Sequence, residues 1–227
     1  MDAELFQSIL SSLILILVIL LIVIKARVRS SFKKQNESII SDDIYSYARL
    51  GMEGEEEVDR ELNLLNKEDY IVLKDLTLLY DNSTHQIDHV VVSNYGIFVI
   101  ETKNYSGFIK GSDKYYKWVQ FIGKKKYMFL NPVFQNKGHI SALQDLLPEY
   151  KDYFVSIVCF TNKSKLKVNT KGIVINLDEL LHIISNFRNE ILILDINEVA
   201  QNLKNLSLTN MNGIEQDHLN NIKKYEK

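Results

Sequence analysis

The stretch Gln86–Lys103, QIDHVVVSNYGIFVIETK, contains two runs of mostly β-branched and aromatic residues, separated by the turn-prone segment Ser93–Gly96. Two such runs with a polar connection predict a β-hairpin. Each run also carries a carboxylate, Asp88 in the first and Glu101 in the second, which apolar packing does not explain. The fold class and the search for a site therefore both start from this hairpin.

Side-chain alternation predicts that the charged residues of the hairpin converge. Because neighbouring side chains of a strand point to opposite faces, Ile97, Glu101 and Lys103 share one face, while Asp88 lies on the side of Val90 in the partner run. Two close carboxylates repel unless a cation lies between them, and Mg²⁺ takes oxygen ligands while it retains several waters. The lysine would then orient or deprotonate a water. An Asp followed by Glu-x-Lys is typical of metal-dependent phosphodiester hydrolysis, although it also fits a solvated strand edge.

A helix is predicted before the hairpin, in GMEGEEEVDRELNLLNK from Gly51 onward. Val58 and Leu62 recur there at helical spacing, and Glu55 lies three positions before Val58 on the same inward stripe. A favourable charge in the first turn of the helix is the alternative explanation of Glu55. A strand, YIVLKDLTLLY, and a loop, DNSTH at residues 81–85, are expected to connect this helix to the hairpin.

Residues 104–137 are basic and aromatic. Between residues 103 and 137, eight lysines are accompanied by one acid, Asp113, and by many aromatic residues. Basic side chains beside aromatic rings suit a polyanion with bases that stack. The same composition fits a two- or three-stranded meander with an aromatic core, a solvated lysine face and a hairpin tip at GKKK, residues 123–126. The candidate nucleic-acid contacts are Lys110, Lys114, Lys117, Lys124, Lys125, Lys126 and His139.

The segment after this meander predicts a helix from Asn131 to about Leu147, with Asn131 as N-cap and Pro132 at the first helical position. Gln135 lies near the start of this helix, at the edge of its packed face, from where it would reach a site. Two further strands, in YFVSIVCFTN and GIVINL, and a helix capped by Asp178 are expected downstream. The single cysteine lies in an apolar run and excludes a disulfide framework.

Residues 5–24 carry no charge and are mostly Leu, Ile and Val, which predicts a transmembrane helix. A cleaved signal peptide is disfavoured, because the preceding residues are acidic and no small-x-small cleavage site follows. Basic residues directly after the span place the rest of the chain in the cytoplasm, as a single-pass protein of the cell membrane. The expected parts are an extracytoplasmic start (1–4), the span (5–24), a basic and polar linker (25–45), a core (46–165), a C-terminal α/β extension (166–208) and a polar tail (209–227).

Histidine offers a competing metal site, because His85 and His89 lie close to Asp88 in the sequence. His89 is adjacent to Asp88 on a strand, however, and should point to the opposite face. A shared histidine site is therefore disfavoured.

These motifs resemble the nuclease-related domain (NERD) family, whose pattern runs from a Gly-Glu at the head of a helix, through QIDHVVV and GIFVIETKNYSG, to NPxxQN and a histidine. In this chain the elements are Gly54-Glu55, Gln86–Val92, Gly96–Gly107, and Asn131–Asn136 with His139. The match covers roughly residues 47–160. It implies an α/β, restriction-endonuclease-like αβββαβ core, with a mixed central sheet flanked by helices.

The resemblance also implies a metal-dependent nuclease. Its site would comprise Glu55, Asp88, Glu101 and Lys103, with Gln135 in support. Asp88 and Glu101 would hold Mg²⁺ or Mn²⁺, Lys103 would orient the attacking water, and Glu55 would bind a second metal or a metal-bound water. The expected substrate is DNA, with RNA as the alternative, and related nucleases that cut both strands are often homodimers. The competing function is a non-catalytic nucleic-acid-binding or protein-interaction module tethered to the membrane.

Overall fold

The computed structural model describes residues 45–189 and 195–207. The predicted transmembrane span, the residues before it, nearly all of the linker and the polar tail lie outside these ranges. No helix within the described residues is both long and apolar enough to cross a membrane. The chain divides into two compact units between residues 49 and 50, and the architecture below is that of the second unit.

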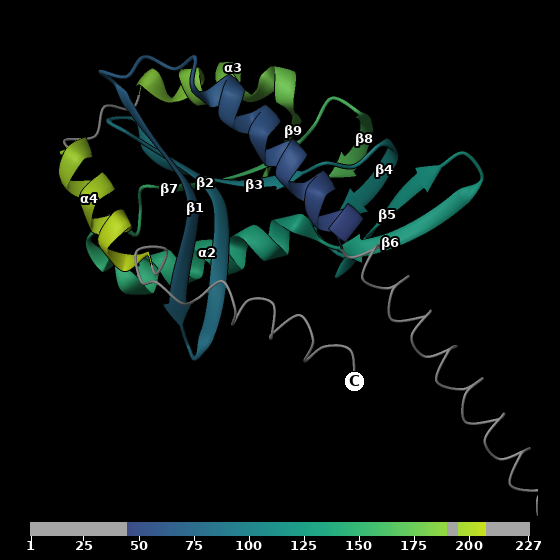
Figure 1. Ribbon diagram of the computed structural model, residues 1–227, viewed down its shortest axis with the longest axis horizontal. Helices are drawn as coiled ribbons and strands as arrows, with labels where there is room; N and C mark the ends of the chain where they lie inside the picture. Colours follow the sequence, from purple (N-terminus) through teal and green to yellow (C-terminus); the bar gives the residue numbers. More distant parts are fainter. Residues whose placement is uncertain (1–44, 190–194, 208–227) are drawn as a thin grey trace, which may run out of the picture. The chain divides into compact units, whose positions relative to one another are not determined.

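A five-stranded mixed sheet forms the centre of this unit, in the order β1-β2-β3-β7-β9 (Figure 1). β1, β2 and β3 are antiparallel, whereas β3, β7 and β9 are parallel. The pairing of β2 with β3 confirms the predicted hairpin, since its two-residue turn lies between Ser93 and Gly96. The strands are β1 (Tyr70–Tyr80), β2 (Ser83–Ser93), β3 (Gly96–Lys103), β7 (Phe154–Phe160) and β9 (Ile173–Asn176).

Helices cover both faces of this sheet, which explains why β3 is buried almost along its whole length. On one face, α2 (Pro132–Leu146) and α4 (Ile196–Leu206) pack against Val90 and Val99. On the other face, the helix through residues 50–62, here called the Glu55 helix, packs with α3 (Leu180–Asn186) against Val91. The fold is therefore α/β, as predicted. Short 3₁₀ turns complete the described chain: η1 (Pro148–Tyr150), η2 (Leu177–Glu179) and η3 (Phe187–Asn189).

A second, four-stranded sheet, in the order β6-β5-β4-β8, is built mainly from the segment between β3 and α2. The predicted meander is confirmed as β4–β6, and its tip contains Gly123 at φ 57°. β8 was not predicted; it pairs parallel to β4 from beyond β7. The inner face of this sheet buries Ile109 and Trp118 against Phe160 of β7. The strands are β4 (Gly107–Ser112), β5 (Lys117–Ile122), β6 (Lys125–Leu130) and β8 (Ser164–Asn169).

Two local predictions are wrong. The expected five-residue loop before the hairpin is a two-residue turn, Asp81–Asn82, in which both residues have a left-handed φ (48° and 56°), as tight hairpin turns require. Ser83 already begins β2. The helical region after β9 is capped by Asn176 together with Glu179, not by Asp178. The predicted order αβββαβ is met by the Glu55 helix, β1, β2, β3, α2 and β7, with the second sheet inserted before α2.

Candidate active site

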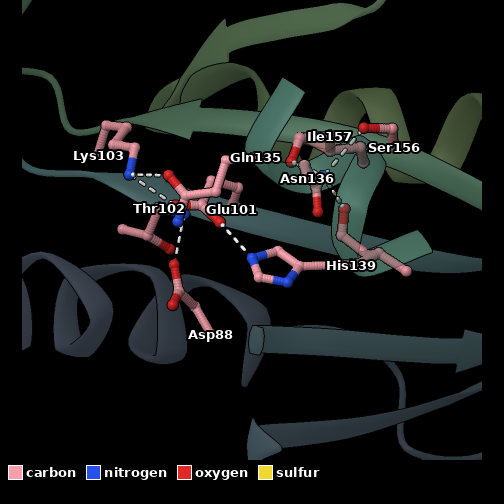
Figure 2. Close-up of polar contacts among 10 residues, drawn as sticks. Asp88, Glu101, Thr102, Lys103, Gln135, Asn136, His139, Ser156 and Ile157 are labelled. Carbon is pink, nitrogen blue, oxygen red and sulfur yellow. Dashed lines mark hydrogen bonds and ion pairs between the residues drawn. The ribbon is translucent and has the colours of Figure 1, made fainter. Parts of the chain in front are cut away.

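Asp88, Glu101 and Lys103 meet at the end of the β2–β3 hairpin (Figure 2). The Thr102 N–H donates to Asp88 Oδ2 over 2.7 Å, so the backbone of β3 fixes the carboxylate that comes from β2. Lys103 Nζ donates to Glu101 Oε1 over 2.6 Å. Alternation along the two strands therefore brings together the three residues that the sequence singled out.

Helix α2 brings Gln135 and His139 to the same place. Gln135 Oε1 accepts a hydrogen bond from Lys103 Nζ at 3.0 Å. His139 is 7% exposed, and its Nε2 lies 3.3 Å from Glu101 Oε2, although the two atoms lack hydrogen-bond geometry. His139, expected at a phosphate, thus lies against the carboxylate that Lys103 also contacts. In the sequence, His139 follows Gln135 by four residues, and this spacing of one helical turn places both side chains on the same face of α2.

Asn136 attaches α2 to the sheet, a role that the sequence did not suggest. Its fully buried amide donates to Val99 O (2.8 Å), Ile157 O (3.1 Å) and Ser156 Oγ (2.9 Å), and so joins α2 to β3 and β7 at once. The start of α2 is fixed by Asn131, whose side chain accepts from the Val133 N–H. These contacts hold the turn of helix that carries Gln135.

The Glu55 helix packs closely against Asn104, next to the site, at Gly54. A Cβ added at Gly54 would lie 2.6 Å from Asn104 Cβ, closer than side chains tolerate. Asn104 follows β3, donates to Leu50 O over 2.6 Å and accepts from Thr161 Oγ1 at 2.9 Å, so it ties the helix to the ends of β3 and β7. The glycine therefore sets how close Glu55 lies to the hairpin.

The strand pairing is interrupted opposite Asp88. Asp75 in β1 has a left-handed φ of 54°, and the β1–β2 ladder omits the Asp75–Asp88 pair while the register continues on both sides. Leu73 and Leu76, which strict alternation would place on opposite faces, both enter one core cluster. Such local breaks re-aim side chains beside functional sites. The sequence of β1 did not predict this interruption of the strand pairing at Asp75.

Burial and neighbouring negative charges raise the pKa values of two site carboxylates. Burial, and then the neighbouring Glu101 carboxylate, raise the pKa of Asp88 from 3.8 to about 8, although the Thr102 N–H acts in the opposite direction. Burial, followed by the charges of Asp75 and Glu101, also raises the pKa of Glu55. In the metal-free protein Asp88 is therefore protonated near neutral pH.

Glu101 and Lys103 behave as an ion pair. Burial acts to raise the pKa of Glu101, but Lys103 and His139 outweigh it, and the pKa lies below its ordinary value. Burial acts to lower the pKa of Lys103, but Glu101 outweighs it, and this pKa is raised. Both groups are accordingly charged at neutral pH, and Lys103 is a hydrogen-bond donor.

The donor set at the site suits a hard divalent cation. Asp88 and Glu101 offer carboxylate oxygens, and Glu101 Oε2 is buried without a hydrogen bond. The described residues contain no close group of three or more His, Cys, Asp or Glu side chains. Mg²⁺ is commonly bound by one or two carboxylates and keeps several waters, so this pair fits it.

The histidines do not form a competing site. His89 points to the opposite face of the sheet, where its Nε2 lies 3.8 Å from Asp59 Oδ1, as alternation predicted. Burial lowers the pKa of His89 to about 4, so it is neutral. His85 lies on the α2 side, with its ring centroid 5.9 Å from that of His139.

The lysines predicted to contact nucleic acid do not converge on the carboxylates. Lys110, Lys117 and Lys126 alternate with inward residues of the second sheet and lie on its outer face. Lys114 lies in the turn between β4 and β5, and Lys124 and Lys125 lie at the β5–β6 tip. Three of the predicted lysines therefore share the outer face of the second sheet, whereas His139, predicted with them, lies against Glu101.

Comparison with known proteins identifies the domain. Residues 50–161, which contain all five site residues, match the model of the nuclease-related domain. An uncharacterized protein of Bacillus anthracis, pXO1-01, is 42% identical over 118 residues, which cover 52% of this chain and 55% of that protein. The chain thus spans about half the length of the relative it matches, and no solved structure gave a significant match. By this match, residues 50–161 form a nuclease-related domain.

Proposed function

We propose that the chain is a metal-dependent nuclease that hydrolyses phosphodiester bonds of DNA, with RNA as the alternative substrate. The observation that carries the proposal is the buried Glu101–Lys103 ion pair beside Asp88, inside a nuclease-related domain. The helix–strand order around this site favours a restriction-endonuclease-like core.

Asp88 and Glu101 would hold Mg²⁺ or Mn²⁺, with a backbone carbonyl near Thr102, and Glu55 would serve a second ion or a metal-bound water. A bound divalent ion supplies positive charge that polarises the scissile phosphate and stabilises the leaving oxygen. It would also relieve the repulsion that raises the pKa of Asp88, because a cation favours the ionised carboxylate.

Lys103 is suited to positioning rather than to removing a proton. Its ammonium has three N–H donors, of which Glu101 and Gln135 accept two within the described part of the chain. The third would orient the attacking water or a phosphate oxygen. Because the pKa of Lys103 is raised, the group stays protonated at neutral pH and makes a poor base.

We further propose that residues 5–24 anchor the protein in the cell membrane as a single span, with the nuclease on the cytoplasmic side. The uncharged run and the basic residues after it support this topology. A C-terminal reporter should be active in the cytoplasm and protease-protected in intact cells; a reporter digested from outside would refute the topology. A homodimer would allow both DNA strands to be cut.

The nuclease is tested by incubating the purified full-length chain with DNA and Mg²⁺ or Mn²⁺. We expect cleavage, and a loss of about 100-fold or more in Glu101→Gln and Lys103→Met, as for removal of one preorganised charge from an active site. Glu56→Gln is the matched control, because Glu56 is exposed on the helix that carries Glu55. An inactive wild type, or variants that cut at its rate, would refute the proposal.

The alternative is a non-catalytic nucleic-acid-binding or protein-interaction module at the membrane. The basic and aromatic composition of residues 104–137 favours it. Under this alternative, nucleic-acid binding would survive both substitutions and no cleavage would occur.

A further inference from the structure

We propose that the outer face of the second sheet, the side opposite Ile109 and Trp118, binds single-stranded nucleic acid. The inference extends the proposed function by naming a substrate class and a second contact surface. It concerns binding alone and does not require turnover.

The strand register arranges this face in rows. One row runs across all four strands as Lys165, Phe108, Phe121 and Lys126, because Phe108 pairs with both Lys165 and Phe121, and Phe121 pairs with Lys126. Two phenylalanines thus lie in the middle of the sheet with a lysine on each side. Phe108 is 37% exposed, and its ring centroid lies 6.2 Å from that of Phe121.

The next row of the outer face also carries lysines. Lys167 pairs with Lys110, which pairs with Val119, which in turn pairs with Met128. Lys165, Lys167 and Lys110 are exposed. Two lysines of one strand that face the same way lie about 6.8 Å apart, at twice the rise of a residue. The face therefore presents a regular array of cations beside a pair of aromatic rings.

The charge on this sheet is one-sided. Its four strands contain six lysines and no aspartate or glutamate. The whole chain, by contrast, has 27 basic and 29 acidic residues. This sheet is therefore basic although the chain as a whole is slightly acidic, as expected for a surface that meets a polyanion.

The aromatic pair favours single strands. Phenylalanines on an open sheet can stack only with bases that are free of a duplex, and four-stranded sheets with central aromatics are a recurring platform for this purpose. A membrane is the competing partner, because the edge strand β6 also exposes Met128 and Leu130 on this face. Both phenylalanine rings, however, lie within the sheet and between lysines, which favours stacking with bases.

This face is distinct from the candidate active site. The inner face of the second sheet stacks Trp118 on Phe160, with parallel rings 6.4 Å apart. Phe160 pairs with Lys103 in the main sheet. The second sheet itself therefore separates the outer face from the carboxylates, and a bound strand would be held beside the site rather than in it.

The test measures binding of the full-length chain, in detergent and EDTA, to a fluorescent single strand of about 20 nucleotides. This strand is longer than the roughly 4–16 nucleotides covered by one OB fold, another domain that binds single strands. For Lys165→Glu/Lys167→Glu we expect at least tenfold weaker binding. The slope of log affinity against log salt should also become shallower by about 1.4, since each phosphate contact of a single strand contributes about 0.7. Lys151→Glu/Lys204→Glu makes the same charge change at exposed positions outside this sheet and should leave binding nearly unchanged.

A second variant isolates stacking. Phe108→Leu/Phe121→Leu retains apolar side chains, and we expect about fivefold weaker binding or more, with an unchanged salt slope. Equal effects of the two lysine double variants, or tighter binding of duplex than of single strand, would overturn the proposal. Capture of anionic phospholipid vesicles through the same lysines, without nucleic-acid binding, would assign the face to a membrane instead.

The outcomes separate this inference from the proposed nuclease. If the chain binds single strands through the outer face but cuts nothing with Mg²⁺ or Mn²⁺, the nuclease alone is refuted. If the chain cuts DNA while the outer-face variants bind as wild type does, this inference alone is refuted.

Discussion

Replacing Asp88 with Asn should stabilise the metal-free protein at alkaline pH. Burial and the Glu101 carboxylate raise the pKa of Asp88 to about 8 in the folded state, from 3.8 for a free side chain. The folded state therefore binds a proton that the unfolded state releases between these values, and folding stability falls as the pH rises from about 4 to about 8. Asparagine does not titrate, and its Oδ1 can still accept from the Thr102 N–H.

The expected size follows from the shift. One pKa unit corresponds to about 1.4 kcal/mol, so about four units set an upper limit of about 6 kcal/mol above pH 8. Because Asp88 is still partly accessible, water screens part of this penalty. We expect Asp88→Asn to exceed wild type by about 2–3 kcal/mol at about pH 9 and by about zero near pH 4.

Urea denaturation of both proteins in EDTA, at several pH values, measures this difference. Asp152→Asn is the control, because Asp152 is exposed and its removal should cause no comparable pH-dependent gain. Added Mg²⁺ should stabilise wild type, by about 2.7 kcal/mol at one hundred times Kd, and not Asp88→Asn. A stability difference that does not grow with pH would refute the reasoning.

Replacing glycine with alanine should change the stability in opposite directions at Gly111 and Gly138. At Gly111 an added Cβ would overlap the Trp118 ring, whereas at Gly138 within α2 it meets nothing within 4 Å; thermal unfolding should show Gly111→Ala destabilised by about 1–3 kcal/mol and Gly138→Ala stabilised by about 0.5–1 kcal/mol. Gly54→Ala should lower both stability and DNA cleavage, because its Cβ would lie 2.6 Å from Asn104 Cβ and push the helix away; unchanged cleavage in this variant would contradict the role given to that contact.

Local rules predicted the parts of the site that lie on one hairpin. The period of two along a strand sufficed to bring Asp88, Glu101 and Lys103 together. The Asn131 cap and the adjacent proline likewise located the start of α2, and hence Gln135.

Contacts between distant segments could not be predicted in this way. Asn136 looks like an ordinary polar helix residue until the tertiary fold buries its amide between β3 and β7. The left-handed Asp75 is opposed by its own intrinsic preference and persists because the surrounding sheet determines its backbone. β8 joins the second sheet through pairing with β4, which is far away in sequence. The surface that Lys165 and Lys167 form together with the meander therefore could not be predicted from the sequence, because it depends on this long-range pairing.

Titration of Mn²⁺ into the metal-free full-length chain, followed by calorimetry, tests most directly whether the carboxylates form a metal site. We expect saturable binding near neutral pH that is lost in both Asp88→Asn and Glu101→Gln and retained in Glu56→Gln. Binding that is absent from wild type, or equally strong in all four proteins, would contradict a metal held between Asp88 and Glu101.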